Sequence, residues 1–335
     1  MKKIKFWQKN TGKKRIHQGW LVEDKETKFV VKVGDHLLPS FLIRLRNCGG
    51  RMSKVMFIDG LNMFIRSYIV NPQMDKHGNP FGGCIGFIKS LQKVCRKFQP
   101  DEVIVVWDGH EGSQRKRALN KEYKEGRGPI RFNRRLIQLE PKEQAKNKAY
   151  QLIRLMEYLN ELPVIQITID FVEADDVIAY GARHPYYGGW DKIIVSSDKD
   201  FFQLCDGRTS IYRPIQDKVV TEQSILNEFK IHPNNFALAR AIAGDPSDNL
   251  PGVPGVGLKT IAKRFTFMAN KEESDCDKIV TNCAMQAKKL KLHQNILQSA
   301  DLIKNNYKIM QLYSPNIRPI NRIFIDNTML NFEPE

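Results

Sequence analysis

Acidic residues follow three predicted β-strands in places where they could hold cations. The strand and acid pairs are Val55–Ile58 with Asp59, Val103–Trp107 with Asp108, and Ile193–Ser197 with Asp198. In an open α/β sheet, functional groups gather beyond the carboxyl ends of the strands. One such aspartate is ordinarily a helix cap or a turn residue. Three at equivalent places would repel each other strongly unless cations lay between them, so they indicate a cation site.

Further carboxylates lie in three short clusters. Glu173 and Asp176 are spaced i and i+3 and would face the same side of a helix. Acidic residues in the first turn of a helix can instead interact favourably with the helix dipole. That interaction rarely requires three carboxylates in four residues, as at Glu173, Asp175 and Asp176. For Asp245 and Asp248 the alternative is a solvated turn. The predicted metal ligands are Asp59, Asp108, Glu173, Asp175, Asp176, Asp198, Asp200, Asp245 and Asp248.

This ligand set favours a particular chemistry. Oxygen ligands without histidine select Mg²⁺, with Mn²⁺ as a substitute, over Zn²⁺ or Cu²⁺. Two such ions about 4 Å apart can bind the attacking and leaving oxygens of a phosphoryl displacement. The chain as a whole is basic, with 53 Lys and Arg against 37 Asp and Glu, a net charge of +16 and a pI near 9.5. Because a basic protein indicates a polyanionic partner, we expect metal-dependent hydrolysis of a nucleic acid.

A basic segment follows the second acid. Residues 115–135 hold nine Lys or Arg against two Glu, and these nine are Arg115, Lys116, Arg117, Lys121, Lys124, Arg127, Arg131, Arg134 and Arg135. A solvated helix face is the usual interpretation of such a run, but the balancing acids are too few, so phosphate contact is favoured. Tyr123 and Phe132, with nearby glycines, suit a mobile loop that stacks on single-stranded DNA. We expect Lys124 or Arg127 to stabilise charge on the reacting phosphate.

A glycine-rich turn, Leu250–Thr260, lies between two helical stretches. It is not a P-loop, because Leu258 separates Gly257 from Lys259 and no strand precedes it. Glycines would let backbone N–H groups approach a DNA phosphate, although a purely structural turn is the alternative. The predicted DNA contacts here are Gly252, Gly255, Gly257, Lys259 and Lys263.

The elements that must position these residues alternate between strand and helix. The strands are expected at Val55–Ile58, Val103–Trp107, Val164–Ile169 and Lys192–Val195, with helices at Gly86–Phe98 and Ala145–Asn160. This order predicts an α/β domain over 52–220, with a central, mostly parallel sheet flanked by helices and a basic arch at about 110–148. From Thr221, a predicted N-cap for Glu222–Phe229, a smaller helical DNA-binding domain is expected over 221–335.

Residues 1–51 carry 13 Lys or Arg against four Asp or Glu and contain one possible strand, Lys28 to Val33. Three interpretations stay open for this extension: a nucleic-acid-binding arm, a small β appendage, or sequence upstream of a start at Met52.

The six cysteines form no C-x-x-C pair, which argues against zinc ribbons. No apolar run approaches the roughly 20 residues of a membrane helix, and no signal peptide is evident, so a cytoplasmic protein is expected.

Taken in order, the motifs resemble the 5′ nuclease family, which includes flap endonucleases, bacteriophage 5′–3′ exonucleases and the 5′-nuclease domain of bacterial DNA polymerase I. The likeness spans about residues 54–265. Its motifs are Asp59-Gly60 with Arg66, Trp107-Asp108-Gly109, Arg117 with Tyr123-Lys124 and Arg127, Val172–Asp176, Ser197–Asp200, Gly244–Asn249 and the Gly252–Gly257 turn.

The resemblance implies a PIN-like 5′-nuclease fold in which the nine acids bind metal. Lys124 and Arg127, with Tyr123, would lie in a helical arch, and Arg66 and Arg117 would contact the substrate. The glycine turn, in a helix–turn–helix hairpin, would grip duplex DNA, often with K⁺. It also implies a monomeric, free-standing nuclease of a bacterial or phage-infected cell, acting in replication or primer removal.

The substrate implied is DNA with a 5′ flap, nick or 5′ end, or an RNA–DNA hybrid, cut by a two-metal mechanism. Three other interpretations are weaker. A binding module that clamps junctions without cutting them would lack some of the acids. A haloacid-type phosphatase needs an aspartate where Leu61 stands. A toxin-like RNA nuclease would lack the long helical domain.

Overall fold

The computed structural model describes residues 52–125, 140–286 and 290–332, together with the backbone of four two-residue strands near the N-terminus. These strands pair as two antiparallel ladders, β1 (Glu23–Asp24) with β2 (Lys28–Phe29) and β3 (Lys32–Val33) with β4 (His36–Leu37). Strand structure is thus present at both ends of the range Lys28 to Val33, where one short strand was expected, and residues 30 and 31 lie outside the described residues. The two ends of this range pair with different neighbours close in sequence, which keeps the loop that each pairing closes short.

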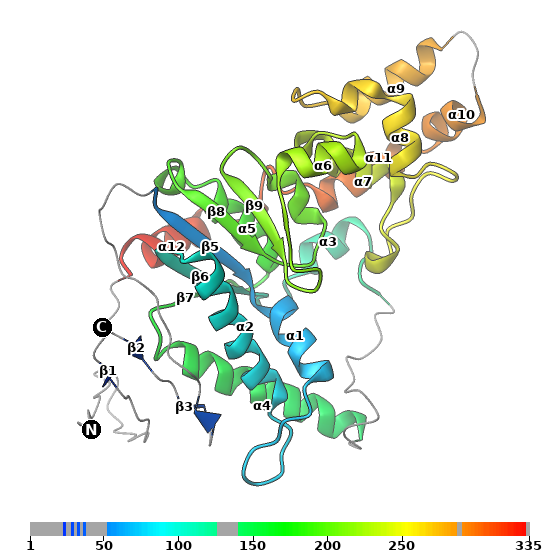
Figure 1. Ribbon diagram of the computed structural model, residues 1–335. Helices are drawn as coiled ribbons and strands as arrows, with labels where there is room; N and C mark the ends of the chain where they lie inside the picture. The colour runs from blue at the N-terminus through cyan, green and yellow to red at the C-terminus, as the bar shows by residue number, and fades with distance from the viewer. Residues whose placement is uncertain are drawn as a thin grey trace.

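A six-stranded sheet forms the centre of the α/β region (Figure 1). Its order is β10-β9-β8-β5-β6-β7, and β10 alone runs antiparallel to its neighbour. The strands are β5 (Lys54–Asp59), β6 (Glu102–Trp107), β7 (Ile165–Thr168), β8 (Asp191–Val195), β9 (Thr209–Arg213) and β10 (Lys218–Val220). The four predicted strands are confirmed. Strand β10, at one edge of the sheet, has only three residues, and β9 lies between β10 and β8; the pattern of buried apolar runs revealed neither strand.

Helices cover both faces of the sheet, because successive side chains of a strand point to opposite sides. Met56 and Ile58 pack in one buried cluster with residues of α1 (Gly60–Val70), α2 (Gly82–Phe98) and α4 (Pro141–Leu159). Val55 and Phe57 pack in the other with α5 (Ala174–Ala182) and α12 (Pro319–Leu330). The sequence of a strand that is buried on both faces is a continuous run of apolar residues, as Val55–Ile58 of β5 shows.

Local signals set where several helices begin. Pro141 occupies the first turn of α4, and Glu140 and Glu143 form a reciprocal capping box there. The predicted N-cap Thr221 is confirmed for α6 (Glu222–Phe229), since its side chain accepts a hydrogen bond from the Ser224 N–H. The remaining helices are α3 (Gln114–Leu119), α7 (Pro233–Ala243), α8 (Leu258–Arg264), α9 (Cys276–Met285), α10 (Lys291–Gln298) and α11 (Ala300–Met310).

The helices α6 to α11 gather on one side of the sheet, next to α3 (Figure 1). The last helix, α12, instead lies against the sheet, where Ile325 and Met329 are buried and the Tyr180 hydroxyl donates to Asp326 Oδ1 at 2.8 Å. A helical C-terminal region is thus present, and the division into domains at residue 220 stays a prediction. None of the helices in the described ranges combines the length and hydropathy that a bilayer span requires.

Candidate active site

Three adjacent strands deliver an aspartate to the same edge of the sheet. β6 and β8 flank β5, and Ile58 of β5 pairs with both Val105 and Val195. Asp59 therefore ends the middle strand, while Asp108 and Asp198 lie just beyond the ends of its neighbours. We call these three residues the strand-end acids. They stand where the strand order reverses, which is where open α/β sheets form their functional crevice.

Asp59 is both a helix cap and a partly buried acid. Its Oδ1 accepts a hydrogen bond from the Asn62 N–H at 3.0 Å at the start of α1, and its Oδ2 accepts one from Ser196 Oγ at 3.0 Å. Burial, reinforced by the negative charges of Asp108 and Asp198, raises the pKa of Asp59 to about 7. Asp59 therefore caps α1 and is also a carboxyl group whose ionised form a bound cation would stabilise.

The other two strand-end acids are held by backbone donors. Asp108 Oδ1 accepts from the Ala174 N–H at 2.8 Å, and Asp198 Oδ1 accepts from the Asp200 N–H at 2.8 Å. Burial raises the pKa of both carboxyls. Within 52–125, 140–286 and 290–332, none of the three strand-end acids forms an ion pair with a lysine, arginine or histidine.

A second set of acids is neutralised by lysines. We call Glu173, Asp175 and Asp176 the lysine-held acids, because Lys116 Nζ lies 2.6, 2.8 and 3.8 Å from their respective carboxylates. Lys124 Nζ adds a contact of 2.5 Å to Glu173. Burial opposes ionisation of Glu173, but the two lysines outweigh it and hold its pKa well below the usual range. Asp176 responds oppositely, because burial raises its pKa to about 6.

The remaining acids form a third set near an arginine. Asp200, Asp245 and Asp248 each present a carboxylate oxygen within 4.8 Å of the others. Arg240 of α7 lies 2.7 Å from Asp200 Oδ1 and also pairs with Asp245. Burial nonetheless raises the pKa of Asp200 to about 8. For Asp245 burial is outweighed by hydrogen bonds from Ser247 and by the Arg240 charge, so its pKa is lowered.

All nine predicted ligands thus belong to one connected acidic site. The strand-end acids link the other two sets, since Glu173 and Asp175 raise the pKa of Asp108, and Asp175 and Asp248 raise that of Asp198, after burial in each case. Residues spread over almost two hundred positions therefore interact electrostatically. Their role as metal ligands remains a prediction.

The basic segment is docked on this site as far as it is described. Lys124 adopts a left-handed backbone conformation (φ 56°), and its N–H donates to the Asp248 carbonyl at 2.9 Å. The side chain of Asn249 donates to the Glu122 carbonyl at 3.1 Å. Lys124 therefore bridges two sets of acids, with its backbone on one and its ammonium group on the other. Arg127 lies outside the described residues.

Two expectations for this segment are corrected. Lys116 was expected to contact phosphate from the surface, but its side chain is only 10% exposed and lies among the lysine-held acids. The Tyr123 ring was expected to stack on a base, but it is buried and its hydroxyl donates to Glu173 Oε2 at 3.1 Å. Both polar groups can be buried because the carboxylates around them replace the hydrogen bonds to water that are lost, and they also balance the charge of Lys116. Arg117 is exposed, its Nε donates to the Tyr123 carbonyl at 3.4 Å, and its contact with substrate stays a prediction.

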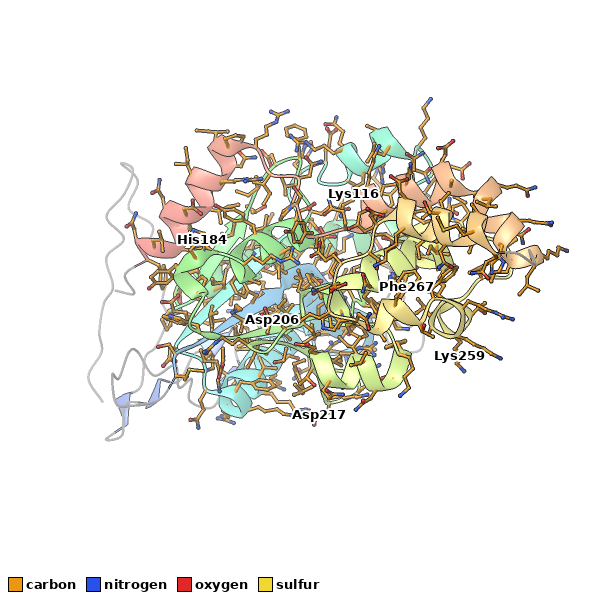
Figure 2. The ribbon with its side chains drawn as sticks, turned by 90° about the horizontal axis from the view of Figure 1, so that it is seen from above. Lys116, His184, Asp206, Asp217, Lys259 and Phe267 are labelled. Carbon is orange, nitrogen blue, oxygen red and sulfur yellow. The ribbon has the colours of Figure 1, made fainter. Side chains whose placement is uncertain are left out.

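The other predicted DNA contacts lie outside the acidic site. Arg66 of α1 is half-buried, and its Nη1 has no hydrogen-bond partner in the described part of the chain. Gly252 packs so closely on the Ala243 carbonyl that a Cβ would lie 2.1 Å from that oxygen, whereas Gly255 (φ 78°) and Gly257 are exposed. Lys259 and Lys263 are exposed on α8, and Figure 2 shows Lys259 at the outer edge of the molecule and Lys116 nearer its middle.

Three residues of the site escaped the sequence analysis. Arg240 precedes Asp245 by five positions, and this proximity was the available signal for a salt bridge. Ser196 directly precedes Ser197-Asp198, and Ser113, whose hydroxyl donates to Glu173 Oε1 at 2.5 Å, lies in the loop after Asp108. No pattern in the sequence distinguishes these serines from loop serines.

The donor set fits hard divalent cations. Carboxylate oxygens are the ligands that Mg²⁺ prefers, and no histidine or cysteine lies among the nine residues. Buried carboxylates without a cation are costly, and the raised pKa of Asp59 expresses that cost. Bound divalent ions would remove it, so the strand-end acids are suited to hold them.

Comparisons with known proteins agree with this geometry. Residues 54–230 match the family model of the 5′-3′ exonuclease N-terminal resolvase-like domain. A flap endonuclease Xni from Shewanella halifaxensis is 31% identical over 268 residues, which cover 78% of this chain and 93% of that protein. The thermostable DNA polymerase I of Thermus thermophilus is 31% identical over 208 residues, 62% of this chain but only 23% of the polymerase.

Among solved structures, the bacteriophage T5 D15 flap endonuclease in a pseudo-enzyme-product complex with DNA and metal ions superposes with a TM-score of 0.66. The match has 20% sequence identity and covers 83% of this chain and 97% of that one. At this identity the likeness confirms the predicted fold.

Proposed function

The chain belongs to the 5′–3′ exonuclease family and is a nuclease, and from that premise we propose that it cuts DNA at 5′ flaps, nicks or 5′ ends with two or more bound Mg²⁺ ions. The observation that carries the proposal is the set of strand-end acids. Asp59 is partly buried and Asp108 and Asp198 are open to solvent, yet desolvation raises the pKa of all three carboxyls, and none of them forms an ion pair within the described ranges. Divalent cations are the counter-ions that this arrangement suits.

The proposal assigns the residues as follows. Asp59, Asp108 and Asp198 hold metal at the centre, with the lysine-held acids on one side and Asp200, Asp245 and Asp248 on the other. Bound divalent ions supply Lewis-acid stabilisation of the phosphate and activation of the attacking water. Lys124, only half-buried beside Glu173, is placed to move to the phosphate when the substrate arrives.

DNA contacts outside the acidic site complete the proposal. Arg66 and Arg117 hold substrate phosphates near the catalytic edge. The helix–turn–helix hairpin formed by α7, the glycine turn and α8 grips the duplex, with K⁺ at the turn and Lys259 and Lys263 reaching the backbone. The charge of +16 favours such contacts. A role in replication or primer removal draws support from the names of the relatives, which include a flap endonuclease and a DNA polymerase I, and the proposed enzyme acts as a monomer.

The test uses three substrates labelled at the 5′ end: a flap, a nicked duplex and an RNA–DNA hybrid. Each is incubated with the protein in Mg²⁺ and in EDTA, and the products are sized. Flap-length products indicate endonuclease activity, and mononucleotides or short oligonucleotides indicate exonuclease activity. Cleavage that persists in EDTA, or the absence of cleavage of all three substrates in Mg²⁺ or Mn²⁺, would overturn the proposal.

A further inference from the structure

The buried ammonium group of Lys116 stands in the middle of the lysine-held acids. Its side chain is 10% exposed, and its Nζ lies within 2.8 Å of both Glu173 and Asp175. A buried lysine is unfavourable unless carboxylates surround it. Burial opposes its charge, but the neighbouring acids outweigh burial and raise the pKa of Lys116 well above its usual value. Lys116 is therefore a permanent cation built into the acidic site.

The hydrogen bonds of Glu173 indicate what this cation excludes. Oε1 accepts from Ser113 Oγ and Lys124 Nζ, each at 2.5 Å, and Oε2 lies 2.6 Å from Lys116 Nζ and 3.1 Å from the Tyr123 hydroxyl. A carboxylate offers about four lone-pair positions. All four positions of Glu173 are in use, so it cannot bind a metal ion until one of these donors leaves.

Lys116 is the donor whose release frees most ligands. It contacts Glu173, Asp175 and Asp176 together, whereas Lys124 contacts Glu173 alone within this set. A divalent ion bound by Glu173 and Asp175 would also lie within a few ångströms of the ammonium group and repel it. The two cations are therefore alternatives for the same carboxylates.

We propose that Lys116 is an internal counter-ion that competes with the divalent cation for Glu173, Asp175 and Asp176, and so sets the Mg²⁺ affinity of this enzyme. In the metal-free protein it holds these carboxylates together. As Mg²⁺ binds, the ammonium group leaves them. The inference rests on the proposed metal site, and Lys116 is a positioning residue that acts through the ligands.

The test measures Mg²⁺ binding to the full chain by calorimetry, without DNA, for the wild type and for Lys116→Met. Loss of the competing charge should tighten the apparent Kd by about tenfold, which is a modest effect for a buried ion pair. Lys116→Arg, which keeps the positive charge, should restore the weaker binding. Lys89→Met is the control, because this exposed lysine of α2 changes the net charge equally and should leave the affinity unchanged.

Thermal unfolding gives the second readout. Lys116→Met should lower the Tm in EDTA and regain most of that loss in saturating Mg²⁺, because the metal replaces the missing cation. An equal loss of Tm with and without Mg²⁺, or an unchanged Kd, would overturn the inference. If Lys116→Met and Lys116→Gln both fail to fold even in Mg²⁺, the lysine is needed alongside the metal and the competition is refuted. A wild type that binds no Mg²⁺ and cleaves nothing would instead refute the proposed function.

Discussion

The lysine-held acids and the strand-end acids lie in one site but differ in how their charge is balanced. Lys116 and Lys124 contact Glu173 at 2.6 and 2.5 Å and hold its pKa low. Asp59, which is only partly buried, has hydroxyl and backbone donors alone, and its pKa is raised to about 7. The more deeply buried carboxylate is therefore the one with the lowered pKa, because two lysines contact it.

This difference separates the counter-ions that the protein itself supplies from those that it must bind from solution. At the lysine-held end the chain carries its own counter-ions, so that end is stable without metal. At the strand ends no described lysine, arginine or histidine forms an ion pair with Asp59, Asp108 or Asp198, although the charges of Lys124 and Arg240 partly lower the pKa of Asp108 and Asp198, respectively. The repulsion among the three acids is therefore only partly offset until external cations bind. A stability cost at a functional centre is expected where activity requires a strained charge distribution.

The largest predicted effect comes from removing a strand-end acid. Asp198→Ala and Asp108→Ala should each reduce single-turnover cleavage of a 5′ flap by at least about 10³-fold, because interactions at the reacting phosphate are lost. Binding of the labelled flap, measured by fluorescence anisotropy, should stay nearly unchanged. Glu228→Ala, an exposed acid on α6, is the control. Normal turnover by either variant in saturating Mg²⁺ would contradict the role of the strand-end acids.

The next effect concerns Lys124, at the junction of the two regions. Lys124→Ala should lower the single-turnover rate by about 10²–10³, as the loss of a transition-state contact does. Quenched-flow measurements with saturating enzyme isolate this step from binding. Lys89→Ala changes an exposed lysine of α2, outside the basic segment, and should leave the rate intact. If both variants react at the wild-type rate, Lys124 has no catalytic part.

A stability measurement sharpens the comparison directly. The folded-state pKa of Asp59 is about 7 against a usual 3.8, so the native state binds the proton more tightly than the unfolded state. Stability is therefore lost as pH rises between these values. Asp59→Asn removes this loss and can keep the α1 cap through its amide oxygen.

The metal-free variant should consequently be more stable than the wild type by on the order of 2–4 kcal/mol at pH 8, and nearly equal to it below pH 4. Urea denaturation in EDTA at the two pH values measures the difference. Adding Mg²⁺ should narrow it at pH 8, because the wild type alone gains the full metal set. A variant that is less stable at pH 8 would show that the Asp59 charge has a counter-ion already.

The smallest effect is expected far from both regions. Lys259→Ala should weaken binding of duplex DNA only a few-fold and reduce the slope of log K against log salt by about 1, since one phosphate contact is lost. Anisotropy titrations at several salt concentrations give this slope. Lys218→Ala, an exposed lysine of β10, should leave it unchanged. An unchanged slope for Lys259→Ala would remove α8 from the DNA interface.

Much of the fold follows from patterns that act over short stretches. The buried runs of β5, β6 and β8 and the cap of α6 are encoded in a few consecutive residues, and parallel strands in an α/β order bring Asp59, Asp108 and Asp198 to one edge. The strands β9 and β10 were not found from such a signal. Their place in the sheet depends on pairing, β9 with β8 and β10 with β9, which a local pattern does not contain.

The sequence by itself thus determined the fold class, the order of the motifs and the identity of the acids. The tertiary structure decided where the long basic side chains go. Lys116, Arg117 and Lys124 look alike in the basic segment, yet Lys116 is buried, Arg117 is exposed and Lys124 joins two sets of acids. A long flexible side chain finds its partner within the space around it, and that space is built from segments distant in the chain. Charge can be read from residue type, but which carboxylates are already neutralised depends on the folded arrangement.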